Sequence, residues 1–134
     1  MADDDKDFCA NITDILSDKG YQIEVAYDGK MAIQKAGENN FDIMLLDMKL
    51  PPLNGLETYR AIREIRLDVV VIVITGYPQE IGDLTQKALQ ESAYVCLEKP
   101  INMDELILLL DRIKEQKVNP VLQKLKGGVH GTRV

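Results

Sequence analysis

The chain has 134 residues, of which 46% are hydrophobic and 28% are charged, and its formal net charge is -6 at pH 7. This length and composition predict a single soluble globular domain with its own core. The negative charge argues against direct nucleic-acid binding, which needs a basic surface. No apolar run approaches the roughly 20 residues of a membrane helix, and the acidic start is unlike a signal peptide, so we expect a cytoplasmic protein. The two cysteines lack metal-type spacing and are expected to be reduced thiols.

Helices and strands are predicted to alternate along the chain. Five segments have apolar residues at helical spacing and are predicted helices: about 6–19, 29–38, 56–62, 81–89 and 102–117. Four segments have the pattern of strands, the first alternating and the others continuously apolar: 21–25, 43–47, 69–75 and 94–97. The connections between them are short, which predicts a parallel sheet with right-handed crossovers.

Polar residues stand at the ends of three predicted strands. Asp47 and Thr75 are the last residues of two apolar runs, and Lys99 follows a third. Two further carboxylates, Asp3 and Asp4, lie near the amino terminus. Open α/β sheets bind ligands at the edge where the carboxyl ends of their strands meet. We therefore expect three acids, a hydroxyl group and a lysine to converge at one edge of the sheet.

A set of short motifs appears in a definite order along the chain. In chain order they are Asp3-Asp4, Ala26-Tyr27-Asp28-Gly29, Asp47 with Pro51 and Asn54-Gly55, Thr75-Gly76, and Lys99-Pro100. Together they resemble the receiver domain of two-component response regulators. The resemblance implies an α/β fold with a doubly wound, flavodoxin-like parallel sheet in the strand order 2-1-3-4-5. It makes residues 1–117 the receiver domain and leaves 118–134 as a partly ordered tail.

The resemblance implies a magnesium site. Asp4 would hold the ion directly, and Asp3 would help through a bound water. Asp47 and the backbone carbonyl of Lys49 would complete the protein ligands. Elementary chemistry agrees, because crowded carboxylates repel one another and a hard dication that prefers oxygen ligands relieves this repulsion.

The resemblance also implies a reaction. Asp47 would accept a phosphoryl group from a phosphohistidine on a sensor histidine kinase or a phosphotransfer protein, which would form an acyl phosphate. Thr75 would hydrogen-bond the phosphoryl group, and Lys99 would form an ion pair with it. Such a domain is a signalling switch that phosphorylates and dephosphorylates itself, and it is not a turnover enzyme.

The sequence departs from the family where phosphorylation would be transmitted to a partner. Cys96, three residues before Lys99, stands where the family usually has an aromatic residue that moves on phosphorylation. Because this aromatic residue and the apolar first strand of the family are both missing, the alternative function is a receiver-like module that docks a partner without being phosphorylated. A magnesium-dependent phosphatase with an aspartyl nucleophile is set aside, because Lys49 stands where such enzymes need a second acid.

The apolar first strand of the family is missing, because only Met1 and Ala2 precede the acid pair. Strand 1 of the expected sheet would be truncated or absent. Three outcomes are open: a start upstream of this chain, occupation of the slot by residues 121–125, or strand exchange between chains. We favour association or rearrangement. We then expect Asp3 and Asp4 to be displaced or mobile, and magnesium binding to be weak.

The last predicted helix offers a second surface for association. Its core stripe at helical spacing comprises Met103, Leu106, Ile107 and Leu110. Leu108 points roughly to the opposite side, so we expect this helix to contact a second copy or a partner protein. The alternative is that Leu108 is an isolated exposed residue or is covered by the tail. We expect neither nucleic acid nor a membrane as a partner.

Overall fold

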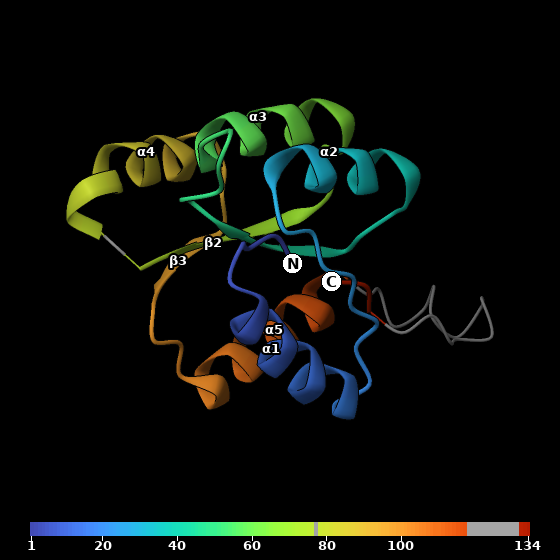
Figure 1. Ribbon diagram of the computed structural model, residues 1–134. Coiled ribbons are helices and arrows are strands. Elements are labelled where there is room, and N and C mark those ends of the chain that lie inside the picture. The colour runs from blue at the N-terminus through green and yellow to red at the C-terminus, as the bar shows by residue number, and fades with distance from the viewer. Residues whose placement is uncertain (77, 118–131) are drawn as a thin grey trace.

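The computed structural model describes residues 1–76, 78–117 and 132–134. Its elements, in chain order, are α1 (Lys6–Asp18), α2 (Gly29–Glu38), β1 (Ile43–Asp47), α3 (Gly55–Ile65), β2 (Val70–Thr75), α4 (Pro78–Gln90), β3 (Val95–Glu98) and α5 (Met103–Lys117). Figure 1 shows α2, α3 and α4 over one face of the sheet and α1 and α5 over the other. The predicted helices and the doubly wound α/β fold are confirmed.

The regular strands form a parallel sheet in the order β1-β2-β3. In its register, Leu45 of β1 lies opposite Ile72 of β2, and Val73 of β2 lies opposite Cys96 of β3. Every residue of β1 is buried, and so is all of β2 after its first residue. Helices cover both faces of these strands, which explains why their sequences lack polar alternation.

Four of the described helices begin at a side chain that accepts a hydrogen bond from the first helical turn. Asp5 caps α1, Asp28 caps α2, Asn54 caps α3 and Asn102 caps α5. Such caps satisfy amide donors that have no partner within the helix. Asp5 follows the acid pair directly, and Asn54 ends the loop after β1, so two of these caps fix the start of helices beside the candidate site.

The predicted strand over residues 21–25 is not a regular strand. The described residues of this region pair only through isolated bridges, in which Gln22 faces Arg133 and Ala26 faces Ala2. A continuous ladder is absent because the neighbour of this segment consists of two separate pieces of the chain. The prediction of a regular edge strand was therefore wrong, although the segment lies where the strand was expected.

Both ends of the described chain occupy the place of the missing first strand. Ala2 forms parallel bridges on both of its sides. Thr132–Val134 pairs with the same two neighbouring segments, nearer to their amino-terminal ends. The sheet therefore has the predicted 2-1-3-4-5 order. Segment 21–26 is the outer member, and a fragmentary strand 1 lies between it and β1. Residues 121–125, the expected alternative occupant, lie outside the described residues.

Helix α5 presents the core stripe that its sequence predicted. Leu106 and Leu110 are buried, and Met103 and Ile107 are partly buried against the same core. Leu108 is 61% exposed, so an apolar side chain is available on the outer face, and association through it stays a prediction. No described helix, α5 included, has the length and apolar character needed to cross a bilayer.

Candidate functional site

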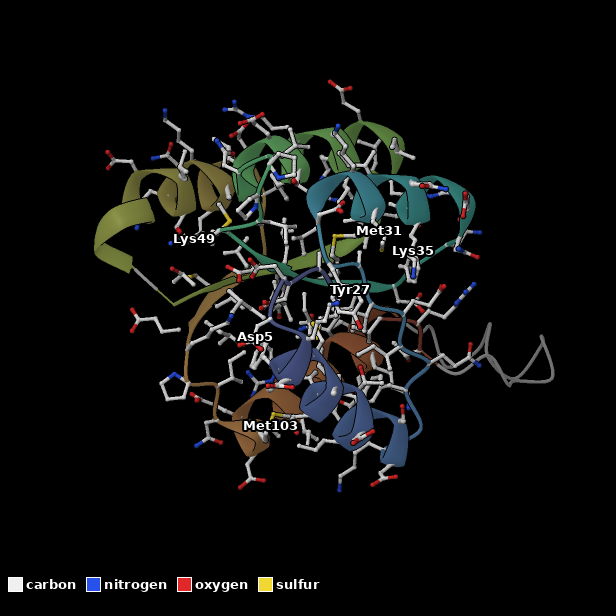
Figure 2. The ribbon with its side chains drawn as sticks, viewed as in Figure 1. Asp5, Tyr27, Met31, Lys35, Lys49 and Met103 are labelled. Atoms are coloured by element: carbon white, nitrogen blue, oxygen red, sulfur yellow. The ribbon has the colours of Figure 1, made fainter. Side chains whose placement is uncertain are left out.

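The residues that the sequence singled out lie at the edge where the strands end. Asp47 is the last residue of β1, Thr75 is the last residue of β2, and Lys99 follows β3. Asp3 and Asp4 follow the short strand fragment that ends with Ala2. Asp3, Asp47 and Thr75 are buried, whereas Asp4 is exposed. Figure 2 shows Asp5 and Lys49, which flank this region in the chain, on the same side of the molecule.

The carboxylates of Asp3, Asp4 and Asp47, which we call the acid cluster, lie close together. Each contributes an oxygen, and the three oxygens lie within 4.8 Å of one another. The expectation of a displaced acid pair was therefore wrong. The reason is that Ala2 is held in the sheet: its N–H donates to Leu45 O at 2.7 Å, and its carbonyl accepts from Asp47 N–H at 2.9 Å.

Asp47 has a perturbed carboxyl group. Burial is the largest cause and raises its pKa to about 6, and the neighbouring charge of Asp3 acts in the same direction. A hydrogen bond from Lys49 N–H to Asp47 Oδ1, at 2.9 Å, and the nearby Lys99 favour the ionised form. The ionised carboxylate is therefore costly, and an added positive charge would stabilise it.

Lys99 supplies the positive charge that the structure holds against these acids. Its Nζ lies 2.9 Å from Asp3 Oδ2 and 3.3 Å from Asp47 Oδ2. Burial opposes the charged form of Lys99, but its contacts with Asp3 and Asp47 hold the pKa of the ammonium above its usual value. One lysine thus faces two buried carboxylates, with the exposed Asp4 beside them.

The acid cluster fits a divalent cation better than it fits Lys99 alone. Asp3 Oδ2 is buried, and although Lys99 is its ion-pair partner, it accepts no aligned hydrogen bond. Asp4 adds a carboxylate that reaches solvent, where a cation can enter. A set of carboxylate oxygens on one open side suits magnesium, which binds a few carboxylates and keeps several waters.

The loop after β1 is fastened to the start of α3. Met48 N–H donates to Ile74 O at 2.9 Å, and Gly55 N–H donates to Met48 O at 2.8 Å. A Cβ atom at position 55 would lie 2.4 Å from the Cα of Met48, so only glycine allows this approach. The tight contact holds the backbone of Lys49, whose carbonyl was the predicted fourth ligand, in the turn next to Asp47.

Two contacts of the site were not foreseen from the sequence. Lys99 Nζ lies 4.5 Å from the centre of the Phe8 ring, in cation–π geometry. The Cys9 thiol donates to the backbone carbonyl of Asp3 at 3.4 Å. Both residues lie within the predicted first helix, over about residues 6–19, and neither belongs to the set of site residues that the sequence predicts. No sequence pattern predicts these two contacts, because they depend on how α1 packs against the site in the tertiary structure.

Cys96 and Tyr94 bear on how a change at the site could reach the surface. Cys96 is half-buried within β3, and Tyr94, two residues earlier, is 42% exposed. The ends of β2 and β3 are joined at the site by a backbone hydrogen bond, in which Lys99 N–H donates to Thr75 O at 2.8 Å. The described residues therefore keep the link between Thr75 and Lys99 but have a thiol at the position of the usual aromatic ring.

The comparison with protein families decides what this arrangement belongs to. The model of the response regulator receiver domain matches residues 1–111. The chain belongs to this family. Over 120 residues it is 32% identical to the transcriptional regulatory protein CpxR homologue of Haemophilus influenzae, an alignment that covers 90% of this chain and 51% of that protein. This receiver chain spans 24% of the length of the transcriptional regulatory protein ZraR of Klebsiella oxytoca and 56% of that of the response regulator ArlR of Staphylococcus saprophyticus.

Solved structures share the fold. A response regulator receiver domain protein from Clostridium thermocellum superposes with a TM-score of 0.78 at 27% identity, covering 87% of this chain and 92% of that one. A response regulator from Burkholderia pseudomallei, solved with a phosphorylated aspartic acid, a calcium ion and citrate, gives a TM-score of 0.72 at 24% identity over 79% of this chain and 61% of that one. The second likeness establishes the fold alone.

Proposed function

We propose that this receiver domain is a phosphoacceptor switch in which Asp47 takes a phosphoryl group from a phosphohistidine on a sensor histidine kinase or a phosphotransfer protein. The proposed metal is magnesium, held by Asp3, Asp4, Asp47 and the backbone carbonyl of Lys49. Thr75 and Lys99 are the proposed partners of the phosphoryl group. The domain would signal by its phosphorylation state and would not turn over a substrate.

The acid cluster, with Lys99 against two of its carboxylates, is the observation that carries this proposal. Phosphoryl transfer needs a positioned nucleophile and compensation of negative charge, and little other covalent chemistry from the protein. Asp47 supplies a nucleophilic oxygen at the end of a rigid strand. Lys99 supplies a positive charge 3.3 Å from that carboxylate. A bound magnesium ion would neutralise further charge and orient the phosphoryl oxygens.

The proposed step is balanced without any further reactant. A carboxylate oxygen of Asp47 attacks phosphorus and forms a P–O bond, while the P–N bond of the phosphohistidine breaks. The electron pair of that bond returns to the imidazole nitrogen, which leaves as histidine. Lys99, which faces Asp3 and Asp47 before transfer, would turn its charge to the new phosphoryl oxygens. The acyl phosphate later reacts with water, which releases inorganic phosphate and restores the carboxylate of Asp47.

The alternative of a docking module without phosphorylation has lost one of its two grounds. It rested on the missing first strand and on Cys96 in place of an aromatic residue. The acid cluster is assembled although the first strand is fragmentary, so the first ground no longer argues against phosphorylation. The phosphorylated aspartate and the cation of the Burkholderia pseudomallei regulator support the proposal by analogy.

Phosphorylation from a small phosphodonor tests the proposal without requiring the partner kinase. The protein is incubated with phosphoramidate and magnesium, and intact-mass spectrometry is used to follow the added phosphoryl group. We expect one labile phosphoryl group per chain, lost in Asp47→Asn and retained in Asp18→Asn, which changes an exposed aspartate at the far end of α1. Omission of magnesium should reduce the labelling at least tenfold. Labelling that persists in Asp47→Asn would exclude Asp47 as the acceptor.

A further inference from the structure

The place of strand 1 in the sheet is filled by two pieces of chain that are remote in sequence. We call the space between segment 21–26 and β1 the central slot. Thr132–Val134 lies in one half of this slot, and Met1–Ala2 lies in the other. The N and C labels in Figure 1 lie close together at this position. The feature is absent from the family pattern, which places one continuous strand there.

Glu24 is the point at which the two pieces meet. Its N–H donates to Val134 O at 3.1 Å, and its carbonyl accepts from the Met1 amino group at 2.8 Å. On the Thr132 side, Gln22 N–H donates to Thr132 O at 3.0 Å, and Val134 N–H donates to Gln22 O at 2.8 Å. These bonds alternate along the segment as in a parallel ladder.

The opposite side of the slot is paired in the same way. Asp42 and Ile43 both donate their N–H groups to Arg133 O, at 2.9 and 3.1 Å. Arg133 N–H donates to a side-chain oxygen of Asp42 at 3.0 Å. Val134 is 1% exposed and packs in the same core cluster as Ile43 and Leu45. The segment is thus bonded on both edges and buried on its face.

The register shows that the two pieces make one strand that lacks a single residue. Gln22 lies opposite Arg133 and Ala26 lies opposite Ala2. Three residues separate Gln22 from Ala26, but only Val134 and Met1 separate Arg133 from Ala2, and three minus two leaves one vacant position. A small cavity of about 20 Å³, lined by both Met1 and Val134, lies at this break.

We propose that Thr132–Val134 is the missing half of the central strand and a positioning element for Asp3 and Asp4. This inference rests on the metal site of the proposed function. Met1–Ala2 is a strand of two residues, and holding each residue in place costs backbone conformational entropy. Thr132–Val134 binds both neighbours of the slot and so keeps them at strand spacing. Ala2 can then bridge them and deliver Asp3 to Asp47.

A deletion and two grafts test this assignment through the register. Chains that lack residues 132–134 are compared with the full chain for magnesium affinity and for hydrogen exchange at the amides of Ala26 and Asp47. Neither amide bonds to the deleted residues, because their acceptors are the carbonyls of Met1 and Ala2. We expect the deletion to weaken magnesium binding at least tenfold and to speed exchange at both amides. Unchanged affinity and exchange would overturn the proposal.

The grafts place new residues directly before Met1 of the deleted chain. The extension Thr-Arg-Val-Val fills the vacant position with its last residue, so both measurements should return to within threefold of the full chain. The extension Thr-Arg-Val is one residue too short and places its arginine at the buried position of Val134. Because a slip of one residue turns every side chain to the opposite face, this graft should fail to restore either measurement. Equal rescue by both grafts would overturn the register argument.

Single substitutions keep the test informative if the deleted chain does not fold. Val134→Ala shortens a buried side chain and should weaken magnesium binding severalfold. Arg133→Ala is the matched control, because the contacts of the half-buried Arg133 side chain within the described part of the chain are a 3.4 Å ion pair with Glu24 and a ring contact with Phe41, and the backbone bonds remain. It should leave the affinity unchanged, and an equal loss in both variants would contradict the proposal.

Two further readouts complete the test. The first distinguishes an intramolecular strand from strand exchange between chains. The second distinguishes a failure of the strand assignment from a failure of the proposed function. If Thr132–Val134 instead fills the slot of a second copy, light scattering will detect a dimer of the full chain that the deletion converts to monomer, and the intramolecular assignment fails. If phosphoramidate never labels the full chain while the exchange pattern behaves as expected, the proposed function fails and the strand assignment stands.

Discussion

The ammonium group of Lys99 lies 2.9 Å from a buried carboxylate oxygen of Asp3, which joins the end of β3 to the residues before α1. This ion pair crosses the sheet edge over the candidate metal site. Lys99 therefore occupies, with its positive charge, the place at which a cation would act on Asp3. The relationship makes lysine and magnesium competitors for one carboxylate, and it carries the first prediction.

Replacing Lys99 by methionine should destabilise the metal-free protein and strengthen magnesium binding. Removal of one partner leaves buried carboxylates uncompensated, so we expect the free energy of unfolding to fall by about 1–3 kcal/mol. The same change removes a competing cation, so the magnesium dissociation constant should fall severalfold. Urea unfolding and calorimetric titration measure the two effects, with Lys30→Met, at an exposed lysine, as the control. A weaker magnesium affinity in Lys99→Met would contradict this competition.

Asp47→Asn should stabilise the metal-free protein at neutral pH. The folded state raises the pKa of Asp47 from 3.8 to about 6, mainly through burial. Because the folded state binds the Asp47 proton more tightly than the unfolded state, the protonated carboxyl group stabilises the fold. This contribution is complete below pH 3.8 and is lost as the pH rises to about 6. The loss is at most about 3 kcal/mol, since each pKa unit corresponds to about 1.4 kcal/mol.

Urea unfolding between pH 4 and 8, without magnesium, checks this second prediction. The wild-type protein should lose stability relative to Asp47→Asn as the pH rises through this window, and the variant should be more stable above about pH 6. Saturating magnesium should shrink or reverse the difference, because the ion stabilises the ionised carboxylate. A variant that is less stable than wild type at every pH would contradict the assigned cause.

The amino group of Met1 should produce a pH dependence of the opposite sign. Burial lowers its pKa from 8.0 to about 5, and the group donates to Glu24 O. For a base with a lowered pKa, the unfolded state binds more protons between these values, so stability rises with pH from about 5 to 8. The gain is at most about 4 kcal/mol.

This third prediction is measured most cleanly in Asp47→Asn, where the titration of Asp47 no longer contributes. Urea unfolding at several values between pH 5 and 8 should show stability increasing with pH in a preparation whose first residue is Met1. The Thr-Arg-Val-Val graft moves the amino group out of the slot and should flatten the curve. A curve that is already flat before grafting would show that the Met1 amino group is not buried.

Leu108→Lys should leave the fold intact and test the outer face of α5. Leu108 is 61% exposed, so its substitution should change the free energy of unfolding by no more than about 0.5 kcal/mol. If the helix is an association surface, the charge should abolish binding of a second copy or partner. Light scattering and urea unfolding measure both, with the buried Leu106→Lys as the destabilised comparison. Unchanged association in Leu108→Lys would leave Leu108 as an isolated exposed residue.

Local sequence patterns determined much of this protein. Apolar spacing located the helices, because a helix that packs on a sheet must carry its apolar residues on one face. Buried strands had to be continuously apolar, which placed Asp47 and Thr75 at strand ends and Lys99 just beyond one. Parallel strands end at one edge, so the sequence alone predicts that these side chains converge.

Only the tertiary structure decided how the first strand was completed. Pairing of Thr132–Val134 with residues about 90 to 110 positions away depends on backbone hydrogen bonds and on a vacant slot, and neither leaves a periodic pattern in three residues. The ion pair of Lys99 with Asp3 and the Phe8 ring beneath it depend on the same assembly. Sequence specified which side chains stand at the strand ends, whereas the placement of Asp3 depended on which piece of chain filled the sheet beside it.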